Sequence, residues 1–448
     1  MNIQEIIQKQ KKFPRSEIKD RITVLRNLAL SIKSHEEEIF RALYEDLGKS
    51  KFEACATETS IVLEDIAMLC RKLPAWAKRR KVGVSPLNMP AKGMICPEPY
   101  GTVLIFSAWN YPFQLMMSPF AGAVAAGNSV VLKPAEQAPA TAEIIQKIIS
   151  EVFPAEQATV CIGGTETSRA LLKEHFDYIF YTGGTEGGKA VARAAAENLT
   201  PITLELGGKS PCIVDKDANL TLTARRIAWG KFLNAGQTCV APDYLLVHES
   251  VRQKLIDLMR TQIRKFFGDD PIRSQDYPQI VNERHFDRLI RLAGGRHIDS
   301  SREKRFIAPS IIDDPRLDEP LMQEEIFGPL LPVLGISSIE EAIHFINSRP
   351  KPLALYYFSS AKKALNQILN QTSSGGVCVN ETVTHLLNAS MPFGGVGASG
   401  MGAYHGQWSF DTFTHYKPVM EKASWIDLPM RYPPGLDKRL KLLKFLSK

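Results

Sequence analysis

The 448-residue sequence predicts an α/β protein with two regions of parallel sheet and a small projecting β arm. Three observations support this fold class. Apolar runs of strand length alternate with helical segments between residues 101 and 197, and the same alternation returns from residue 201. The segment 80–99 instead combines short β-prone runs with a turn that contains Pro and Asn, which is typical of a hairpin.

The N-terminal region is predicted to be helical. From Ser16 to about Leu73 the apolar residues recur at spacings of three and four, as on one face of an amphipathic helix. Gly48 is a natural stop for one of these helices, because glycine readily adopts the left-handed conformation that ends a helix.

In the first alternating region, a glycine-rich turn joins a strand to a helix in "FYTGGTEGGKAV", Phe180 to Val191. Gly183, Gly188 and Lys189 fit the spacing of a nucleoside-triphosphate loop, but Ala190 stands where that motif needs a hydroxyl for magnesium. The spacing of a dinucleotide fingerprint is absent too. The free N–H groups of the following helix suit an anion, with a plain glycine-rich turn as the equal alternative.

The second alternating region begins near Pro201. Its expected strands are "ITLELGG", "SPCIVD" and "YLLVHE", and its expected helices are "TLTARRIAWGKFLNAG" and "SVRQKLIDLMRTQIRKFF". This pattern predicts another α/β unit.

Composition excludes several classes of protein. The 55 basic and 48 acidic residues are interspersed, so no nucleic-acid partner is expected. The seven cysteines contain no C-x-x-C pair, which argues against a disulfide framework and a zinc site and favours reduced thiols in a cytoplasmic protein with no metal. The most apolar stretch, "LMMSPFAGAVAAG", is too short to span a bilayer.

Five residues are candidates for chemistry. Cys239, in "NAGQTCVAPDY", is a nucleophile or a small buried hydrophobe. Glu205 ends an apolar strand, where burial would raise its pKa toward that of a general base, or it is a paired structural carboxylate. Asn110 is an oxyanion donor or a turn residue. Lys133 and Glu136 follow a strand at the edge where α/β sheets bind nucleotides, or they are solvated.

The chain resembles the aldehyde dehydrogenase superfamily, most closely its class 3 branch. The resemblance rests on seven motifs in family order, from about residue 100 to the "RYPP" near residue 434: "WNYP", "VVLKPAE", "FYTGGTEGGK", "LELGGKSP", "NAGQTCVAPDY", "QEEIFGP" and "MPFGGVGASGMGAYHGQWSFDTFTHYKPV". It implies a Rossmann-like cofactor domain from 1–79 and 100–207, an oligomerisation arm at 80–99, and a second α/β, catalytic domain at 208–398. Residues 399–448 would form a C-terminal oligomerisation segment and a basic amphipathic tail.

The resemblance also implies a mechanism. Cys239 would be the nucleophile, Asn110 an oxyanion donor beside the Cys239 N–H, and Glu205 the base that releases the product. The reaction would be NAD(P)-dependent oxidation of an aldehyde to a carboxylic acid through a thiohemiacetal and a thioester on Cys239. The expected substrates are medium-chain aliphatic or aromatic aldehydes. Tyr111, Trp229 and Phe393 would form an aromatic entrance, or equally be core residues.

For the cofactor, the resemblance implies that Gly183, Gly184 and Gly188 face the pyrophosphate of NAD. Gly184 replaces a serine that contacts phosphate in many relatives. Lys133 and Glu136 would contact the adenosine ribose, and since Lys133 can accommodate a 2′-phosphate, NADP is an alternative cofactor. Glu325 would bond the nicotinamide ribose, and Phe327 would pack near the nicotinamide ring.

The resemblance and the residues of the tail also indicate possible partners, and several other functions stay open. The shortened N-terminal region resembles that of class 3 members, so we expect a homodimer. The tail places Leu436, Leu440, Leu443 and Leu446 on one helical face among basic residues, which suits an anionic membrane surface, a subunit interface or a frayed end. The alternatives are a coenzyme A-acylating or semialdehyde-specific dehydrogenase, a P-loop-like nucleoside triphosphatase, a cysteine hydrolase and a non-catalytic binding protein.

Overall fold

The apolar runs of the first alternating region form a six-stranded sheet with strand order β16-β7-β6-β3-β4-β5. The structure is a computed structural model, and it describes residues 3–427, 432–434, 436–441 and 444. Every pairing in this sheet is parallel except that of β16 with β7. The strands are β3 (Thr102–Phe106), β4 (Ser129–Lys133), β5 (Ala158–Val160), β6 (Tyr178–Thr182), β7 (Ile202–Glu205) and β16 (Gly400–Met401).

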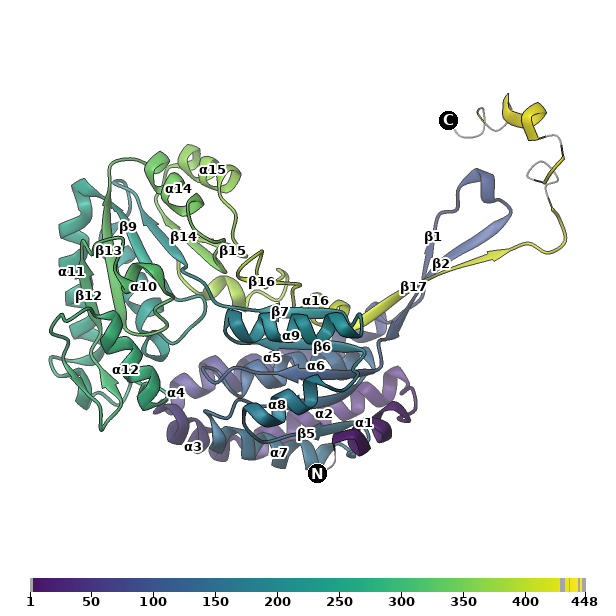
Figure 1. The fold of residues 1–448 in the computed structure, drawn as a ribbon, viewed down its shortest axis with the longest axis horizontal. Helices are drawn as coiled ribbons and strands as arrows, with labels where there is room; N and C mark the ends of the chain where they lie inside the picture. Colours follow the sequence, from purple (N-terminus) through teal and green to yellow (C-terminus); the bar gives the residue numbers. More distant parts are fainter. Residues whose placement is uncertain (1–2, 428–431, 435, 442–443, 445–448) are drawn as a thin grey trace.

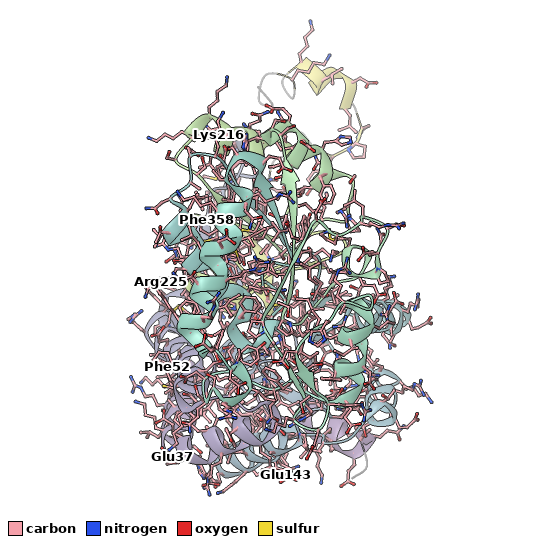
Figure 2. All side chains as sticks on the ribbon, turned by 90° about the vertical axis from the view of Figure 1, so that its left-hand side faces the viewer. Glu37, Phe52, Glu143, Lys216, Arg225 and Phe358 are labelled. Carbon is pink, nitrogen blue, oxygen red and sulfur yellow. The ribbon has the colours of Figure 1, made fainter. Side chains whose placement is uncertain are left out.

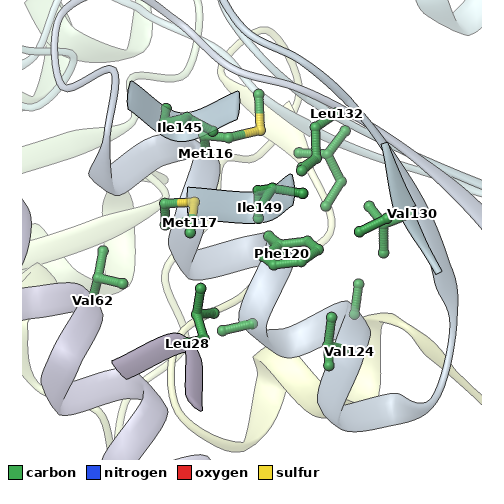
Figure 3. Packing of buried hydrophobic residues seen from close by; sticks show 14 of the residues in the cluster. Leu28, Val62, Met116, Met117, Phe120, Val124, Val130, Leu132, Ile145 and Ile149 are labelled. Carbon is green, nitrogen blue, oxygen red and sulfur yellow. The ribbon is translucent and has the colours of Figure 1, made fainter. Parts of the chain in front are cut away.

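Helices cover both faces of this sheet, because alternate side chains of each strand are apolar on either side. Figure 3 shows the larger core, where Phe120 and Ile149 pack against Val130 and Leu132. The helices on that face are α2 (Ile18–Ser34), α3 (Glu36–Leu47), α5 (Ser60–Trp76), α6 (Gln114–Ala126) and α7 (Pro139–Val152). The helices on the other face are α1 (Ile3–Lys11), α8 (Thr165–Leu172) and α9 (Thr185–Glu197).

The second alternating region forms a parallel six-stranded sheet with strand order β12-β13-β9-β8-β14-β15. Its strands are β8 (Pro211–Val214), β9 (Tyr244–His248), β12 (Ser310–Asp313), β13 (Leu330–Ile336), β14 (Ala354–Phe358) and β15 (Gly376–Val379). Its face helices are α10 (Leu220–Phe232), α11 (Glu249–Phe267) and α12 (Glu283–Leu292) on one side, and α14 (Ile339–Asn347) and α15 (Lys362–Gln371) on the other. The hairpin β10 (Ser300–Ser301) and β11 (Phe306–Ile307) and the short helix α13 (Pro320–Gln323) lie in its loops.

An antiparallel arm projects away from both sheets (Figure 1). It consists of β1 (Arg80–Val82), β2 (Ala91–Pro99) and β17 (Thr414–Lys422), with the turn of 3-10 helix η2 (Pro86–Asn88) between the first two. The strand β17 follows α16 (Gln407–Thr412) and pairs with β2 along its whole length. Two parallel sheets and a β arm confirm the predicted fold class.

The two sheet units occupy opposite ends of the molecule in a side view. Lys216 of the second unit lies at the end opposite to Glu37 and Glu143 of the first, and Arg225 of the second unit lies between them (Figure 2). The N-terminal helices form as predicted, and Gly48 ends α3 in the left-handed conformation with φ of 69°. A feature that the pattern did not predict is the π-helix η1 (Cys55–Thr59) between α4 (Lys51–Ala54) and α5.

The C-terminal tail is described only in part. Leu436–Arg439 forms the short 3-10 helix η7, and the side chains of Leu436 and Leu440 are exposed. Leu443 and Leu446, which the amphipathic prediction also used, lie outside the described residues, as does Arg431 of "RYPP". Among the described residues, every helix is too short or too polar to cross a bilayer.

Candidate active site

A cavity of about 230 Å³ lies where the carboxyl edge of the first sheet meets the second unit. Eight predicted site residues line it: Asn110, Gly183, Gly184, Glu205, Cys239, Glu325, Phe327 and Phe393. They come from loops far apart in the sequence. The cavity is where a thiol, a carboxamide and two carboxylates face a common space.

A left-handed turn delivers Cys239 to this cavity. After α10 the chain enters η3 (Leu233–Gly236), where Asn234, Ala235 and Gly236 have positive φ values of 51°, 50° and 75°. A Cβ on Gly236 would lie 2.3 Å from the Gly328 carbonyl oxygen, so this position requires glycine. The turn points the chain toward the first sheet, which brings Cys239 to the cavity wall.

The Cys239 thiol is held in its neutral form. Burial raises its pKa to about 12, and the carboxylates of Glu325 and Glu205 add to the shift, because a negative neighbour disfavours a thiolate. Chemistry at this sulfur therefore needs a group that takes its proton.

Asn110 is buried just past the end of β3, with its side chain against the loop that carries Cys239. Its Nδ2 donates to the carbonyl oxygen of Gln237 at 3.0 Å. Its own carbonyl accepts from Asn234 Nδ2 at 2.7 Å and from Lys49 Nζ at 2.9 Å. The carboxamide is thus fixed beside the reactive loop.

Glu205 is the last residue of β7 and is buried. Neither of its carboxylate oxygens has a hydrogen-bond partner in the described part of the chain. Burial raises the pKa of Glu205 well above its ordinary value. An unpaired acid of this kind is what a general base at neutral or alkaline pH requires.

Glu325 is the second carboxylate of the cavity and lies against Gly207. A Cβ on Gly207 would be 2.1 Å from Glu325 Oε2, so the glycine makes room for this side chain. Desolvation raises the pKa of Glu325 to about 7, and the negative charge of Asp243 adds to the shift.

Three residues that the sequence analysis did not single out hold the loop of Glu325. Arg288 donates to the carbonyl oxygens of Glu325 at 3.0 Å and Ile326 at 2.5 Å. Lys209 forms an ion pair with Asp243, whose Oδ1 accepts the Ile326 N–H at 2.9 Å. Lys209 lies in the quoted motif "LELGGKSP" and Asp243 in "NAGQTCVAPDY". Their place in these motifs is the sequence feature that could have identified them as functional residues.

The glycine turn lies between β6 and α9, with Gly184 immediately before the first helical residue. A Cβ on Gly183 would be 2.4 Å from the Tyr181 hydroxyl oxygen, whereas one on Gly184 would have no described atom within 4 Å. Gly188 does not line the cavity. It packs inside α9 against Leu206, where a Cβ would be 2.6 Å from a side-chain carbon.

Lys133 ends β4 and Glu136 follows it, farther along the same edge, and neither lines the cavity. Lys133 is buried, its Nζ donates to the Pro134 carbonyl oxygen at 2.7 Å, and burial lowers its pKa. Glu136 is exposed, and a Cβ on Gly164 would be 2.4 Å from its Oε2.

Of the three aromatic residues predicted to form the entrance, one lines the cavity and two do not. Phe393 lines the cavity, whereas Tyr111 and Trp229 do not. Tyr111 is buried, with its hydroxyl 2.6 Å from Thr238 Oγ1. Trp229 is 40% exposed on α10. The aromatic wall is completed by Trp109, whose ring centroid is 5.3 Å from that of Phe327. Trp109 is the first residue of the quoted "WNYP", of which the sequence analysis proposes Asn110 and Tyr111 as site residues.

All seven cysteines are unpaired. Within the described ranges, no three His, Cys, Asp or Glu side chains gather as a metal site would require.

Known proteins match the chain along nearly its whole length. The model of the Aldehyde dehydrogenase family matches residues 2–419. The 4,4'-diaponeurosporen-aldehyde dehydrogenase of Staphylococcus aureus is 48% identical over 92% of this chain and 91% of its own length. The dimeric NADP-preferring aldehyde dehydrogenase of Canis lupus familiaris is 45% identical over 93% and 94%.

Solved structures agree with these matches. One described as the substrate-bound state of Staphylococcus aureus AldH covers 100% of both chains with a TM-score of 0.97 and 45% identity. The NAD+ complex of a Bacillus cereus aldehyde dehydrogenase has a TM-score of 0.86 and 27% identity, and covers 94% of this chain and 89% of that one. With the fold, the cavity and the sequence in agreement, the chain belongs to the aldehyde dehydrogenase family.

Proposed function

We propose that the protein oxidises aldehydes to carboxylic acids with NAD or NADP as the hydride acceptor. Cys239 is the nucleophile, Asn110 the oxyanion donor and Glu205 the general base. The observation that carries this proposal is the convergence of Asn110, Glu205 and Cys239 on one cavity at the carboxyl edge of a Rossmann-like sheet.

The residues present fit a dinucleotide. Space at Gly184 leaves the N-terminus of the 13-residue helix α9 open to a pyrophosphate, and its free N–H groups and dipole favour an anion. Lys133 and Glu136 on the same edge would hold the adenosine ribose, and Glu325 the nicotinamide ribose. When bound, the oxidised nicotinamide supplies a hydride acceptor. The dog relative is named NADP-preferring, and the Bacillus cereus structure is an NAD+ complex.

In acylation, the Cys239 thiol gives its proton to water in the cavity and the sulfur attacks the aldehyde carbon. The carbonyl electron pair moves to oxygen as the carbon–sulfur bond forms. Asn110 Nδ2 and the Cys239 backbone N–H donate to this oxyanion, which concentrates stabilisation where charge develops. Collapse of the oxyanion with loss of hydride from carbon leaves a thioester on Cys239.

In deacylation, Glu205 in its ionised form takes a proton from water as the water oxygen attacks the thioester carbon. The carbon–sulfur bond then breaks, releasing the carboxylic acid and the Cys239 thiol. Because burial raises the pKa of Glu205, this step should accelerate as pH rises through that pKa.

Medium-chain aliphatic or aromatic aldehydes fit the cavity wall. Trp109, Phe327 and Phe393 present aromatic surface to it, and such surface favours apolar substrates. A semialdehyde-specific enzyme would need a cation for the second carboxylate of its substrate. Arg288 is a cation that lines the cavity, but it donates to backbone carbonyls of the Glu325 loop. This use of Arg288 favours an apolar aldehyde over a semialdehyde.

The arm is the proposed homodimer contact. In its register Val82, Gly93 and Met420 stand side by side, so Val82, Tyr416 and Met420 share one face. All three side chains are exposed in the single chain. Exposed apolar side chains gathered on one face suit a second copy. Contact of the tail with an anionic membrane stays a prediction.

The test is an assay of reduced nicotinamide by absorbance, with NAD or NADP against hexanal, benzaldehyde and succinic semialdehyde. We expect turnover with the first two aldehydes and none in Cys239→Ala. Independence from added coenzyme A would support water as the acyl acceptor. Magnesium-dependent ATP hydrolysis without aldehyde oxidation would contradict the proposal.

A further inference from the structure

A buried ion pair stands behind the proposed oxyanion donor, outside the cavity. Lys49 follows the end of α3, and Glu58 lies within the π-helix η1. Lys49 Nζ is 2.6 Å from Glu58 Oε1, and both side chains have 0% exposure. A buried ion pair adds little net stability compared with apolar side chains of the same size. Stability alone therefore does not explain why Lys49 and Glu58 are paired here.

The contacts of Lys49 converge on the segment that carries Asn110. Besides Glu58, its ammonium donates to the Asn110 carbonyl oxygen at 2.9 Å. It also stands 4.0 Å from the centroid of the Tyr111 ring, within the range of a cation–π contact. The cation therefore holds two consecutive residues, and the first of them lines the same cavity as Cys239.

Glu58 fixes the same segment at its other end. Its Oε2 accepts the backbone N–H groups of Phe113 at 3.1 Å and Gln114 at 2.8 Å, where α6 begins. The extra residue of a π-helical turn changes the direction of the side chains that follow, and such turns are frequent at functional sites. Glu58 is thereby aimed into the interior at the start of α6.

The segment held in this way meets the cysteine loop twice. Asn110 Nδ2 donates to Gln237 O at 3.0 Å, and the Tyr111 hydroxyl lies 2.6 Å from Thr238 Oγ1. A shift of the segment would move both contacts together, within two residues of Cys239.

We propose that Lys49 and Glu58 are positioning residues that hold the Asn110 carboxamide where it stabilises the oxyanion formed on Cys239. The inference rests on the proposed function and extends it to two residues that touch neither substrate nor cofactor. Because both act through Asn110, removing them should slow acylation and leave nucleotide binding intact.

The test variant is Lys49→Met/Glu58→Gln, which removes both charges of the pair together, so that neither partner is left buried without the other. Acylation is followed in two ways, each per titrated Cys239 thiol. One is single-turnover reduction of NAD by hexanal. The other is attack of the thiolate on p-nitrophenyl acetate without nucleotide, which forms the same type of oxyanion and releases p-nitrophenolate. We expect both rates to fall about 10- to 100-fold, with the Kd for NADH unchanged.

Asp46→Asn is the matched control. Asp46 lies near the end of α3, and its buried carboxylate contacts the start of another helix, α7. It accepts hydrogen bonds from the Thr141 N–H at 2.8 Å and from the Thr141 hydroxyl at 2.7 Å. It makes no hydrogen bond to the Asn110 segment in the described chain. We expect this variant to lower Tm and to leave both acylation rates unchanged.

A double-mutant cycle separates positioning from general damage. Asn110→Ala alone should lower acylation by roughly 10²-fold, and adding Lys49→Met/Glu58→Gln should then lower it by less than about twofold. Wild-type acylation in the pair variant, or fully additive losses, would overturn the inference. If the wild type reacts with the ester but oxidises no aldehyde, the proposed function fails while the ester reaction still tests the pair. Failure of both reactions would overturn both.

Discussion

At the residue scale, two carboxylates and a thiol share the cavity, and their charges are coupled. Glu325 is the larger of the two carboxylate contributions that raise the pKa of Cys239. An ionised carboxylate disfavours a thiolate beside it, so the charge on Glu325 works against the reactive form of the sulfur.

Glu325→Gln should therefore make Cys239 easier to ionise. The substitution removes a negative charge, the pKa of the thiol falls, and the pH profile of alkylation by iodoacetamide shifts to lower pH. Glu324→Gln is the control, because Glu324 pairs with Arg291 at the surface and should leave the profile unchanged. A shift to higher pH in Glu325→Gln would show that this carboxylate promotes thiolate formation.

The sequence predicts single residues well where a motif surrounds them and poorly where contacts decide. Asn110, Glu205 and Cys239 converge as expected, since each ends or follows a strand or a helix. The resemblance implies an entrance of Tyr111, Trp229 and Phe393, but Trp109 lines the cavity with Phe393, and Tyr111 and Trp229 do not. Which of the aromatic rings on either side of Asn110 faces the cavity depends on backbone direction, and composition does not contain that information.

At the element scale, the strands were predictable because parallel strands buried on both faces leave continuous apolar runs. The π-helix η1 and the left-handed turn at 234–236 were not. The turn depends on a distant partner, because Gly236 closely approaches Gly328. Glu58 within η1 pairs with Lys49, nine residues earlier, and this contact leaves no repeating sequence pattern. The pairing of β17 with β2, more than 300 residues apart in register, likewise has no local signal.

The turn before α9 provides an element-scale prediction. Gly184 has φ of −72° and open space at its Cβ position, so Gly184→Ser should fold normally and gain a few tenths of a kcal/mol as a helix N-cap. Its hydroxyl should maintain or strengthen NADH binding, measured by fluorescence titration. Gly183→Ala is the comparison: its Cβ would press on the Tyr181 hydroxyl, and we expect weaker binding. Unchanged binding in both variants would mean that the turn does not face the nucleotide.

At the scale of the whole molecule, the chain passes from the second sheet back to the first and then into the arm. β16 joins the edge of the first sheet and β17 completes the arm (Figure 1). The sequence analysis placed the hairpin at 80–99, but the arm needs a third strand from residues 414–422. An interface built on this arm would therefore depend on two segments that are far apart in the sequence.

Met420→Lys tests that interface. Met420 is 56% exposed on the apolar face of the arm, and a charge there should separate two copies. Sedimentation equilibrium should give twice the 49.9 kDa chain mass for the wild type and a smaller mass for the variant. Glu421→Lys, on the opposite face, should remain dimeric. A wild-type mass of one chain would contradict the dimer.

In the proposed reaction, an acyl group forms on Cys239 and Glu205 directs its hydrolysis. Glu205→Gln keeps the shape of the cavity but removes the base, so a burst of reduced cofactor should precede slow turnover. Mass spectrometry of this variant, quenched after mixing with NAD and hexanal, tests the claim most directly. We expect a hexanoyl group on the peptide that contains Cys239. An unmodified Cys239 peptide despite the burst, or full turnover in the variant, would contradict it.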